Sequence, residues 1–115
     1  MVTNARYVPD RGDLIWISLD PQLGHEQAGR RPALVLSPSR YNASVGLAVV
    51  CPITNQAKGY PFEVPLPDES VVTGVVLSDQ VKSLDWRKRQ ANYAAECPPE
   101  ILVAVIEKLE MLLGT

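Results

Sequence analysis

The chain has 115 residues, a formal net charge of −2, 46% hydrophobic residues and 21% charged residues. This length fits one domain spanning residues 1–115, and this hydrophobic content excludes a disordered chain. No apolar run approaches the roughly 20 residues that span a bilayer, and residues 1–10 lack an apolar signal region, so we expect a cytoplasmic protein without membrane contact.

The cysteines and the histidine give no sign of a metal centre. Cys51 and Cys97 do not form a short-spaced pair, and His25 is the only histidine, whereas a zinc site usually needs several such ligands. Cys51 lies in an apolar segment, where a cysteine is most simply a small core residue. We therefore expect neither a metal nor another cofactor.

Charge is unevenly distributed along the chain. Residues 96–115 contain four glutamates and a single lysine. The basic residues group instead at positions 30–31, at Lys82 and at positions 87–89. A fold could gather these groups into one positive face that binds nucleic acid, or leave them scattered as solubilising charges.

The first half of the chain predicts three strands. Residues 13–19 are rich in β-branched and aromatic residues, and residues 33–37 form a second apolar run after Pro32. Residues 40–44 predict a turn or one helical turn, and residues 46–53 predict a third strand. Trp16 is expected in the core rather than as an exposed platform for stacked bases.

The second half predicts two or three further strands. Residues 62–66 alternate as a half-exposed strand does, and Pro65 suits an edge. Residues 74–84 predict a fifth strand with a bend or a bulge, and residues 86–93 a sixth that is short and basic. Trp86 is expected to pack beneath this basic segment.

The hydrophobic period becomes helical after the two prolines at 98 and 99. Apolar residues recur at spacings of three and four up to Leu113, and Gly114 suits a helix end. This stripe would pack on the sheet or on a partner subunit. The whole pattern predicts a mainly β (α+β) fold, a small bent antiparallel sheet or partly open barrel with a C-terminal helix.

The loop at 24–32, between the first two strands, carries more chemistry than a connection needs. It holds a histidine, a glutamate, a glutamine and two adjacent arginines, namely His25, Glu26, Gln27, Arg30 and Arg31. Loops between strands often carry function, although a solvated, charged hairpin loop would have a similar composition. Residues 54–58 and 79–82 also place reactive polar groups beside strands.

Motifs such as a nucleophile elbow or a phosphate-binding glycine loop do not occur in the sequence. Metal-free cleavage of RNA does not need a nucleophile from the protein, because the ribose 2′-hydroxyl of the substrate is the nucleophile. DNA lacks this hydroxyl. The protein must supply a proton acceptor, a proton source and a group that stabilises the charge on phosphorus. Glu26, Thr54 and Arg31 are of suitable types, since a guanidinium matches phosphate oxygens.

Each of these residues also has an ordinary structural interpretation. Glu26 could simply pair with Arg30, and Arg31 could be a surface charge. The Thr54 hydroxyl could bond to the backbone at a strand end. His25 could make a hydrogen bond within its loop.

Seven short motifs cover the chain up to the terminal helix. They are Arg-Tyr-Val-Pro-Asp at 6–10, Gly-Asp-Leu-Ile-Trp at 12–16, Glu-Gln-Ala-Gly at 26–29, Arg-Pro-Ala-Leu-Val-Leu-Ser-Pro at 31–38, Tyr-Asn at 41–42, Lys-Gly-Tyr-Pro-Phe-Glu-Val at 58–64 and Asp-Gln-Val-Lys-Ser at 79–83. Each motif alone is weak. In this order and at this spacing they resemble the MazF toxins of MazE–MazF toxin–antitoxin pairs.

The resemblance implies an SH3-like, partly open barrel of the MazF/PemK/CcdB type that works as a homodimer. It implies sequence-specific, metal-independent cleavage of single-stranded RNA, including mRNA, with 2′,3′-cyclic phosphate and 5′-hydroxyl ends and inhibition of translation and growth. The family's catalytic arginine, threonine and glutamate correspond to Arg31, Thr54 and Glu26. The residues implied to bind substrate are Gln27, His25, Arg30, Lys58, Gln80 and Lys82.

The resemblance further implies a MazE-like antitoxin, whose flexible acidic segment would cover the basic groove, with operator DNA bound only through the antitoxin complex. His25 departs from the family's pattern, in which many relatives have serine. Toxins of the CcdB type share the fold but act on a protein target, so a non-catalytic binding toxin is the alternative. An adhesive domain that assembles through the helix stripe is a third possibility.

Overall fold

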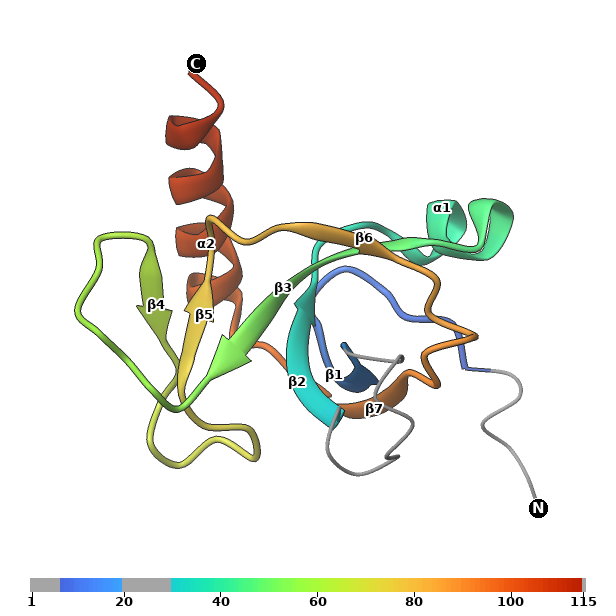
Figure 1. Ribbon diagram of the computed structural model, residues 1–115, viewed down its shortest axis with the longest axis horizontal. Coiled ribbons are helices and arrows are strands. Elements are labelled where there is room, and N and C mark those ends of the chain that lie inside the picture. Colours follow the sequence, from blue (N-terminus) through green and yellow to red (C-terminus); the bar gives the residue numbers. More distant parts are fainter. Residues whose placement is uncertain (1–6, 20–29, 115) are drawn as a thin grey trace.

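A computed structural model describes residues 7–19 and 30–114 of the chain (Figure 1). Within this part the elements follow one another as β1 (Asp13–Ser18), β2 (Arg30–Val35), α1 (Ser39–Val45), β3 (Ala48–Thr54), β4 (Glu63–Pro65), β5 (Val75–Leu77), β6 (Lys82–Leu84), β7 (Asn92–Glu96) and α2 (Pro99–Leu112). The predicted class, mainly β with a C-terminal helix, is confirmed. In the same residues no helix has the length and apolar character needed to cross a membrane.

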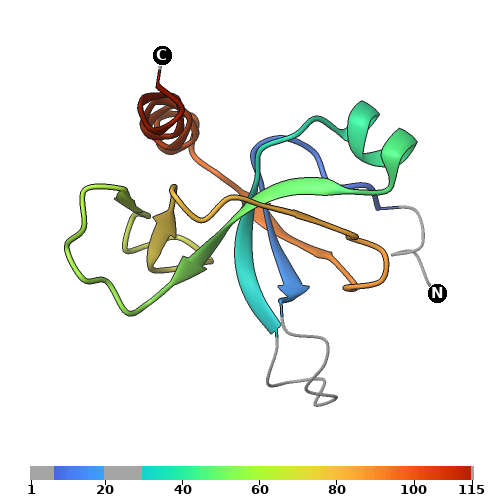
Figure 2. The same ribbon diagram turned by 45° about the horizontal axis from the view of Figure 1, so that its top comes forward.

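The strands form one strongly bent antiparallel sheet that does not close. Its order is β4-β5-β3-β2-β1-β7, and β6 pairs with the first half of β3. The end of β3 pairs with β5 through Ile53 and Thr54. Figure 2 shows α2 nearly end-on at one side of the sheet, with α1 lying at the far side from it. The edge position of β4 agrees with the prediction made from Pro65, which is exposed.

Two predicted strands differ from the structure. Residues 74–84 form two strands, β5 and β6, because the chain turns between them, where the Gln80 N–H donates to the Leu77 carbonyl (3.1 Å). Residues 86–90 form a turn, and the strand follows as β7. The Asp85 carboxylate accepts the Lys88 N–H (3.0 Å), and such aspartate contacts favour a turn over an extended chain.

Hydrophobic side chains pack on both faces of the sheet, because successive residues of a strand point to opposite faces. One cluster lies between the sheet and α2 and contains Leu14, Cys51 and Val105. Cys51 is thus a core residue, as expected, and burial raises the pKa of its thiol to about 12. The second cluster contains Ile15, Ile17, Val35, Val50 and Trp86.

The two tryptophans have different environments. Trp86 is buried, and the Arg87 guanidinium lies over its ring at 4.6 Å from the centroid, which confirms the predicted packing beneath the basic segment. Trp16 is 39% exposed, so its expected core position is wrong. Trp16 lies on the same face of β1 as Leu14, but the hydrophobic cluster against α2 includes Leu14 and does not extend to Trp16.

Asn42, a fully buried residue of α1, connects four segments of the chain. Its Nδ2 donates to the carbonyls of Pro9 (2.7 Å) and Ser37 (3.0 Å), and its Oδ1 accepts the Ser37 hydroxyl (2.6 Å). Its backbone carbonyl accepts the indole N–H of Trp86 (3.0 Å). The same Ser37 hydroxyl accepts the N–H of Val49 in β3 (2.8 Å).

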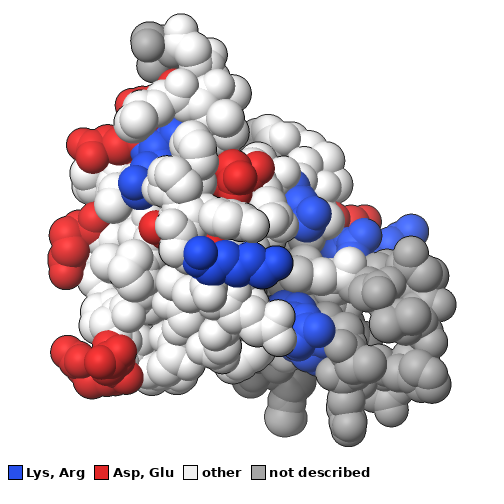
Figure 3. All heavy atoms as spheres, turned by 60° about the vertical axis from the view of Figure 1, so that its left-hand side comes forward, with Lys and Arg blue, Asp and Glu red and all other residues white. Residues whose placement is uncertain are grey.

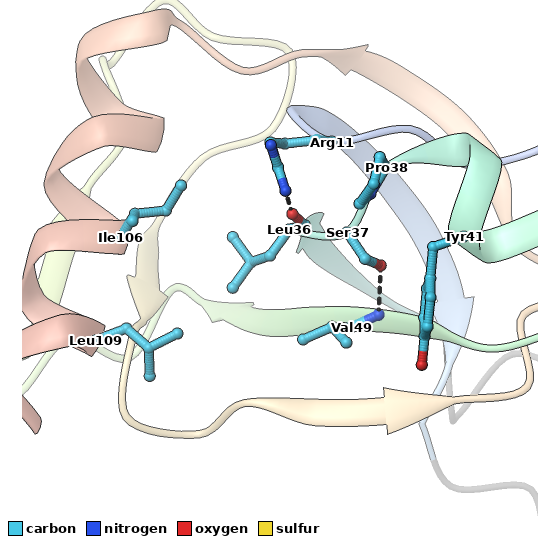
Figure 4. Close-up of a pocket in the computed structure, with 8 residues that line it drawn as sticks. All are labelled: Arg11, Leu36, Ser37, Pro38, Tyr41, Val49, Ile106 and Leu109. Atoms are coloured by element: carbon cyan, nitrogen blue, oxygen red, sulfur yellow. Dashed lines mark hydrogen bonds between the residues drawn. The ribbon is translucent and has the colours of Figure 1, made fainter. Parts of the chain in front are cut away.

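An apolar groove of about 500 Å³ runs between α1 and α2 over strands β2 and β3 (Figure 4). Ile106 and Leu109 of α2 face Leu36 and Val49 across it. The other residues that line it are Arg11, Ser37, Pro38 and Tyr41. Beyond the groove, Met111 near the end of α2 and Leu113 just after it are largely exposed, each at 70%.

We expect Asn42→Ala to lower the free energy of unfolding by about 2–4 kcal/mol, because buried groups of Pro9 and Ser37 lose their partners at roughly 1–3 kcal/mol each. Urea denaturation measures this change. Ser44→Ala, an exposed change on the same helix, is the control and should stay within about 0.5 kcal/mol of the parent. A loss for Asn42→Ala no larger than that of Ser44→Ala would contradict the role of the amide.

Candidate functional site

A cavity of about 350 Å³ opens at the end of the sheet where the pairing of β2 and β3 stops. We call it the strand-end cavity, and it is lined by Leu19, Arg31, Pro32, Pro52, Ile53, Thr54, Asn55, Gln56 and Leu77. The ladder between the two strands ends at the pair Ala33 and Pro52. Because a proline has no N–H to donate to a ladder, the prolines on both strands favour the end of pairing at this point.

The strands bring Arg31 and Thr54 to the same cavity. The last pair of the ladder is Ala33 and Pro52. If the antiparallel register is continued by two residues, Arg31 lies opposite Thr54, and opposite residues in a ladder have neighbouring side chains. Pro32 restricts the preceding residue to an extended backbone, which holds Arg31 in the strand. The result is an exposed arginine and a half-buried threonine that line one cavity.

The Thr54 hydroxyl is oriented by one backbone contact. Its oxygen accepts the N–H of Gln56 at 3.1 Å. This is the hydrogen bond to the backbone at a strand end that the structural interpretation of Thr54 predicts. A hydroxyl that accepts one hydrogen bond still has its own proton to donate. Thr54 can therefore donate to an oxygen of a ligand in the strand-end cavity.

The backbone behind Thr54 is held by a close approach from Gly74. Gly74 has φ +117°, and a Cβ there would lie 2.4 Å from the Thr54 carbonyl oxygen. Its neighbour Thr73 donates from its hydroxyl to Oδ1 of Asn55 at 3.1 Å. These contacts fix the end of β3, and only glycine fits at position 74.

A second, smaller cavity of about 220 Å³ adjoins the first. We call it the loop cavity, and it is lined by Thr54, Gln56, Lys58, Tyr60, Glu63, Leu77 and Gln80. Thr54, Gln56 and Leu77 line both cavities. The Tyr60 ring is 61% exposed, and an exposed ring of this kind can stack on a nucleobase.

Four of the site residues predicted from the sequence line these two cavities. Arg31 and Thr54 lie in the strand-end cavity, and Thr54, Lys58 and Gln80 lie in the loop cavity. Lys82 is exposed on β6 and belongs to the lining of neither. Glu26, Gln27 and His25 lie outside the residues that the structure describes.

Arg30 points its guanidinium at the backbone of other segments. It donates to the carbonyls of Gln90 (2.8 Å) and Arg89 (3.3 Å), and a longer contact of 3.5 Å reaches the carbonyl of Trp16. Arg30 therefore ties the turn before β7 to the start of β2. Its predicted contact with substrate stays a prediction.

Three polar residues of the loop cavity, Gln56, Tyr60 and Glu63, were not among the site residues predicted from the sequence. Gln56 lies two positions after Thr54, inside the 54–58 segment that places reactive polar groups beside a strand, so its position was a usable signal. Tyr60 and Glu63 lie in the Lys-Gly-Tyr-Pro-Phe-Glu-Val motif, but residue types alone did not show which of its members face a cavity.

Charge is separated on the face shown in Figure 3. Basic side chains lie across the middle of this face, and most acidic side chains stand along one edge. Arg31 and Lys58, which line the two cavities, are both exposed. A positive surface beside a cavity attracts anionic ligands.

Comparison with known proteins gives consistent matches. The family model described as "PemK-like, MazF-like toxin of type II toxin-antitoxin system" matches residues 10–113. The chain is 51% identical over 110 residues to the endoribonuclease toxin MazF of Escherichia coli K12, covering 96% of this chain and 98% of that protein.

Two crystal structures from Deinococcus radiodurans have the same fold. The structure of MazF superposes with a TM-score of 0.86 at 58% identity, covering 95% of this chain and 99% of that one. A structure of MazE–MazF gives a TM-score of 0.85 at 52% identity, covering 95% and 98%.

We expect Gly74→Ala to destabilise the fold more than Gly46→Ala, because only the first change drives a methyl group into the Thr54 carbonyl. Gly46 also has a positive φ, of 85°, but a Cβ there meets nothing within 4 Å, so its cost is that of the backbone alone, about 1–2 kcal/mol. Urea unfolding of both variants measures the difference. Equal losses would show that the approach of Gly74 to Thr54 does not constrain the strand end.

Proposed function

The chain belongs to the PemK-like, MazF-like toxin family of type II toxin–antitoxin systems, and we propose that it cuts single-stranded RNA at specific sequences, without a metal ion, along its two adjoining cavities. It is an endoribonuclease toxin of this family. The observation that carries the proposed site is the presence of Arg31 and Thr54, from neighbouring strands, in one cavity. The single domain of residues 1–115 would carry the whole activity.

The proposed reaction transfers the phosphodiester within the RNA. The ribose 2′-oxygen bonds to phosphorus, the bond from phosphorus to the 5′-oxygen breaks, and the products are a 2′,3′-cyclic phosphate and a 5′-hydroxyl. The 2′-hydroxyl proton goes to a base, and the leaving 5′-oxygen takes up a proton. Arg31 stabilises the charge on the phosphorane oxygens because its planar donors match them.

The remaining roles follow from the side chains available. Thr54 donates its free hydroxyl proton to a phosphate oxygen and positions the group for attack. Glu26 is the proposed proton acceptor. Lys58 and Gln80 bind RNA from the loop cavity, and the polar residues of the 24–32 loop, together with Lys82, contribute further contacts.

The partner of the toxin is a MazE-like antitoxin, in line with the MazE–MazF complex of the Deinococcus relative. We propose that an acidic segment of this antitoxin lies over the basic face and excludes RNA, since the same charges attract both. Operator DNA would be bound only through the complex.

The apolar groove supports a homodimer. It joins half-buried side chains of α2 to Val49 and Leu36, and the neighbouring end of α2 exposes Met111 and Leu113. Exposed apolar surface of this kind is typical of contacts between protein chains. A second copy of the chain, placed on this surface, would cover it.

We expect the purified protein to cleave RNA in EDTA, and Arg31→Ala to lower kcat by about 100-fold or more, because it removes the group that stabilises the phosphorane. Gel analysis of a labelled RNA measures the rate, and end-group analysis identifies the cyclic phosphate. Arg40→Ala, an exposed arginine on α1 that lines neither cavity, is the control and should cleave nearly as well as the parent. Intact RNA, or full toxicity of Arg31→Ala in cells, would favour the non-catalytic binding toxin.

We expect Tyr41→Asp to weaken dimerisation at least 10-fold, because a charge would then be buried in the apolar groove on association. Tyr41 is 40% exposed in the single chain, so the change should leave folding intact. Sedimentation equilibrium measures the dissociation constant, with Val71→Asp, 75% exposed in the loop before β5, as control. A parent protein that stays monomeric at micromolar concentration would contradict the homodimer.

A further inference from the structure

The loop that leads into β4 is held by a carboxylate rather than by packing. Glu63 Oε1 accepts the N–H of Gly59 (3.0 Å) and that of Lys58 (3.2 Å), and Oε2 also accepts the Lys58 N–H (3.0 Å). In return, the N–H of Glu63 donates to the Tyr60 carbonyl at 3.1 Å. The loop is thus closed on itself around one side chain.

Glu63, at the end of this loop, is held in the sheet, whereas residues 55–61 of the loop are not packed against the core. Glu63 pairs with Leu77 across β4 and β5, and Leu77 lines both cavities. All residues from 55 to 61 are exposed, so side-chain burial contributes little to the position of the tip. Gly59 has φ +79°, a conformation that turns its N–H toward the carboxylate at no cost to glycine.

The side chains carried by this loop form one wall of the loop cavity. Lys58 and Tyr60 line it together with Gln80, and Thr54 lines both this cavity and the strand-end cavity. Moving the loop would therefore change the loop cavity, whereas Arg31 lies on another strand and Thr54 is held independently by Gly74.

We propose that Glu63 is a positioning residue, whose carboxylate fixes the loop at 58–60 and thereby sets the affinity for RNA and the choice of cleavage sequence. The inference rests on the proposed function. It assigns Glu63 no contact with the reacting atoms, so its effect should fall on KM and on sequence choice rather than on kcat.

An opposite role would follow from the same contacts. Two successive backbone N–H groups also suit a phosphate, and a carboxylate beside an RNA groove repels the substrate. If repulsion dominated, removal of Glu63 would lower KM. The two roles therefore predict changes of opposite sign.

The test compares Glu63→Ala and Glu63→Gln with the parent, using an RNA that contains the parent's own cleavage sequence. We expect Glu63→Ala to raise KM about 10-fold or more, the scale of charge-assisted hydrogen bonds, with kcat changed less than about 3-fold and with additional cleavage sequences. Glu63→Gln keeps one acceptor oxygen, so its KM should lie between those of the parent and Glu63→Ala. Glu69→Gln, an exposed change of equal charge in the loop after β4, should leave KM and the cleavage sequence as they are.

An unchanged or lowered KM in Glu63→Gln, or a fall in kcat alone, would overturn the proposal even if Glu63→Ala failed to fold. Amide exchange gives a readout that does not depend on cleavage. The N–H groups of Lys58 and Gly59 should exchange faster in Glu63→Gln than in the parent, and equal rates would overturn the positioning role. A parent protein that leaves RNA intact would instead overturn the proposed function.

Discussion

The hydrogen bonds of one buried amide help to hold the strands that line the strand-end cavity. Asn42 ties α1 to the segment before β1, to the end of β2 and to Trp86. Trp86 begins the turn whose last carbonyls accept the guanidinium of Arg30. A series of contacts therefore runs from Ser37, just after β2, through Asn42 and Trp86 to Arg30 at the start of β2. Arg31 is the residue that follows Arg30 in this strand.

The adjacent residues Arg30 and Arg31 face different surroundings because of the geometry of a β-strand. Successive side chains point to opposite sides, so Arg30 can bond to the carbonyls of the turn while Arg31 faces the strand-end cavity. Backbone carbonyls offset part of the positive charge of Arg30. Two adjacent positive charges repel each other, and this repulsion is reduced in the fold, so one guanidinium stays available for an anion.

Sequence pattern predicted the elements whose signal is local. The apolar and alternating runs, the edge proline and the helical period of the hydrophobic residues located β1 to β4 and α2. The residue types, together with the family resemblance, indicated the cavity residues Arg31, Thr54, Lys58 and Gln80. The pattern failed where a few polar contacts break a strand, as at Gln80 and Asp85. It also missed Trp16 and Glu63, because exposure and loop contacts depend on which segments meet across the fold.

The attachment of β4 and β5 has a consequence for how the protein loses activity. Within residues 7–19 and 30–114, these short strands pair with the rest of the sheet through the last two residues of β3, and they carry walls of both cavities. Units with few connecting hydrogen bonds open at lower free energy than the whole molecule. Because Val64 and Val76 are also buried in the cluster that contains Val105 of α2, the hairpin would detach together with α2, and cleavage would cease once this packing is lost.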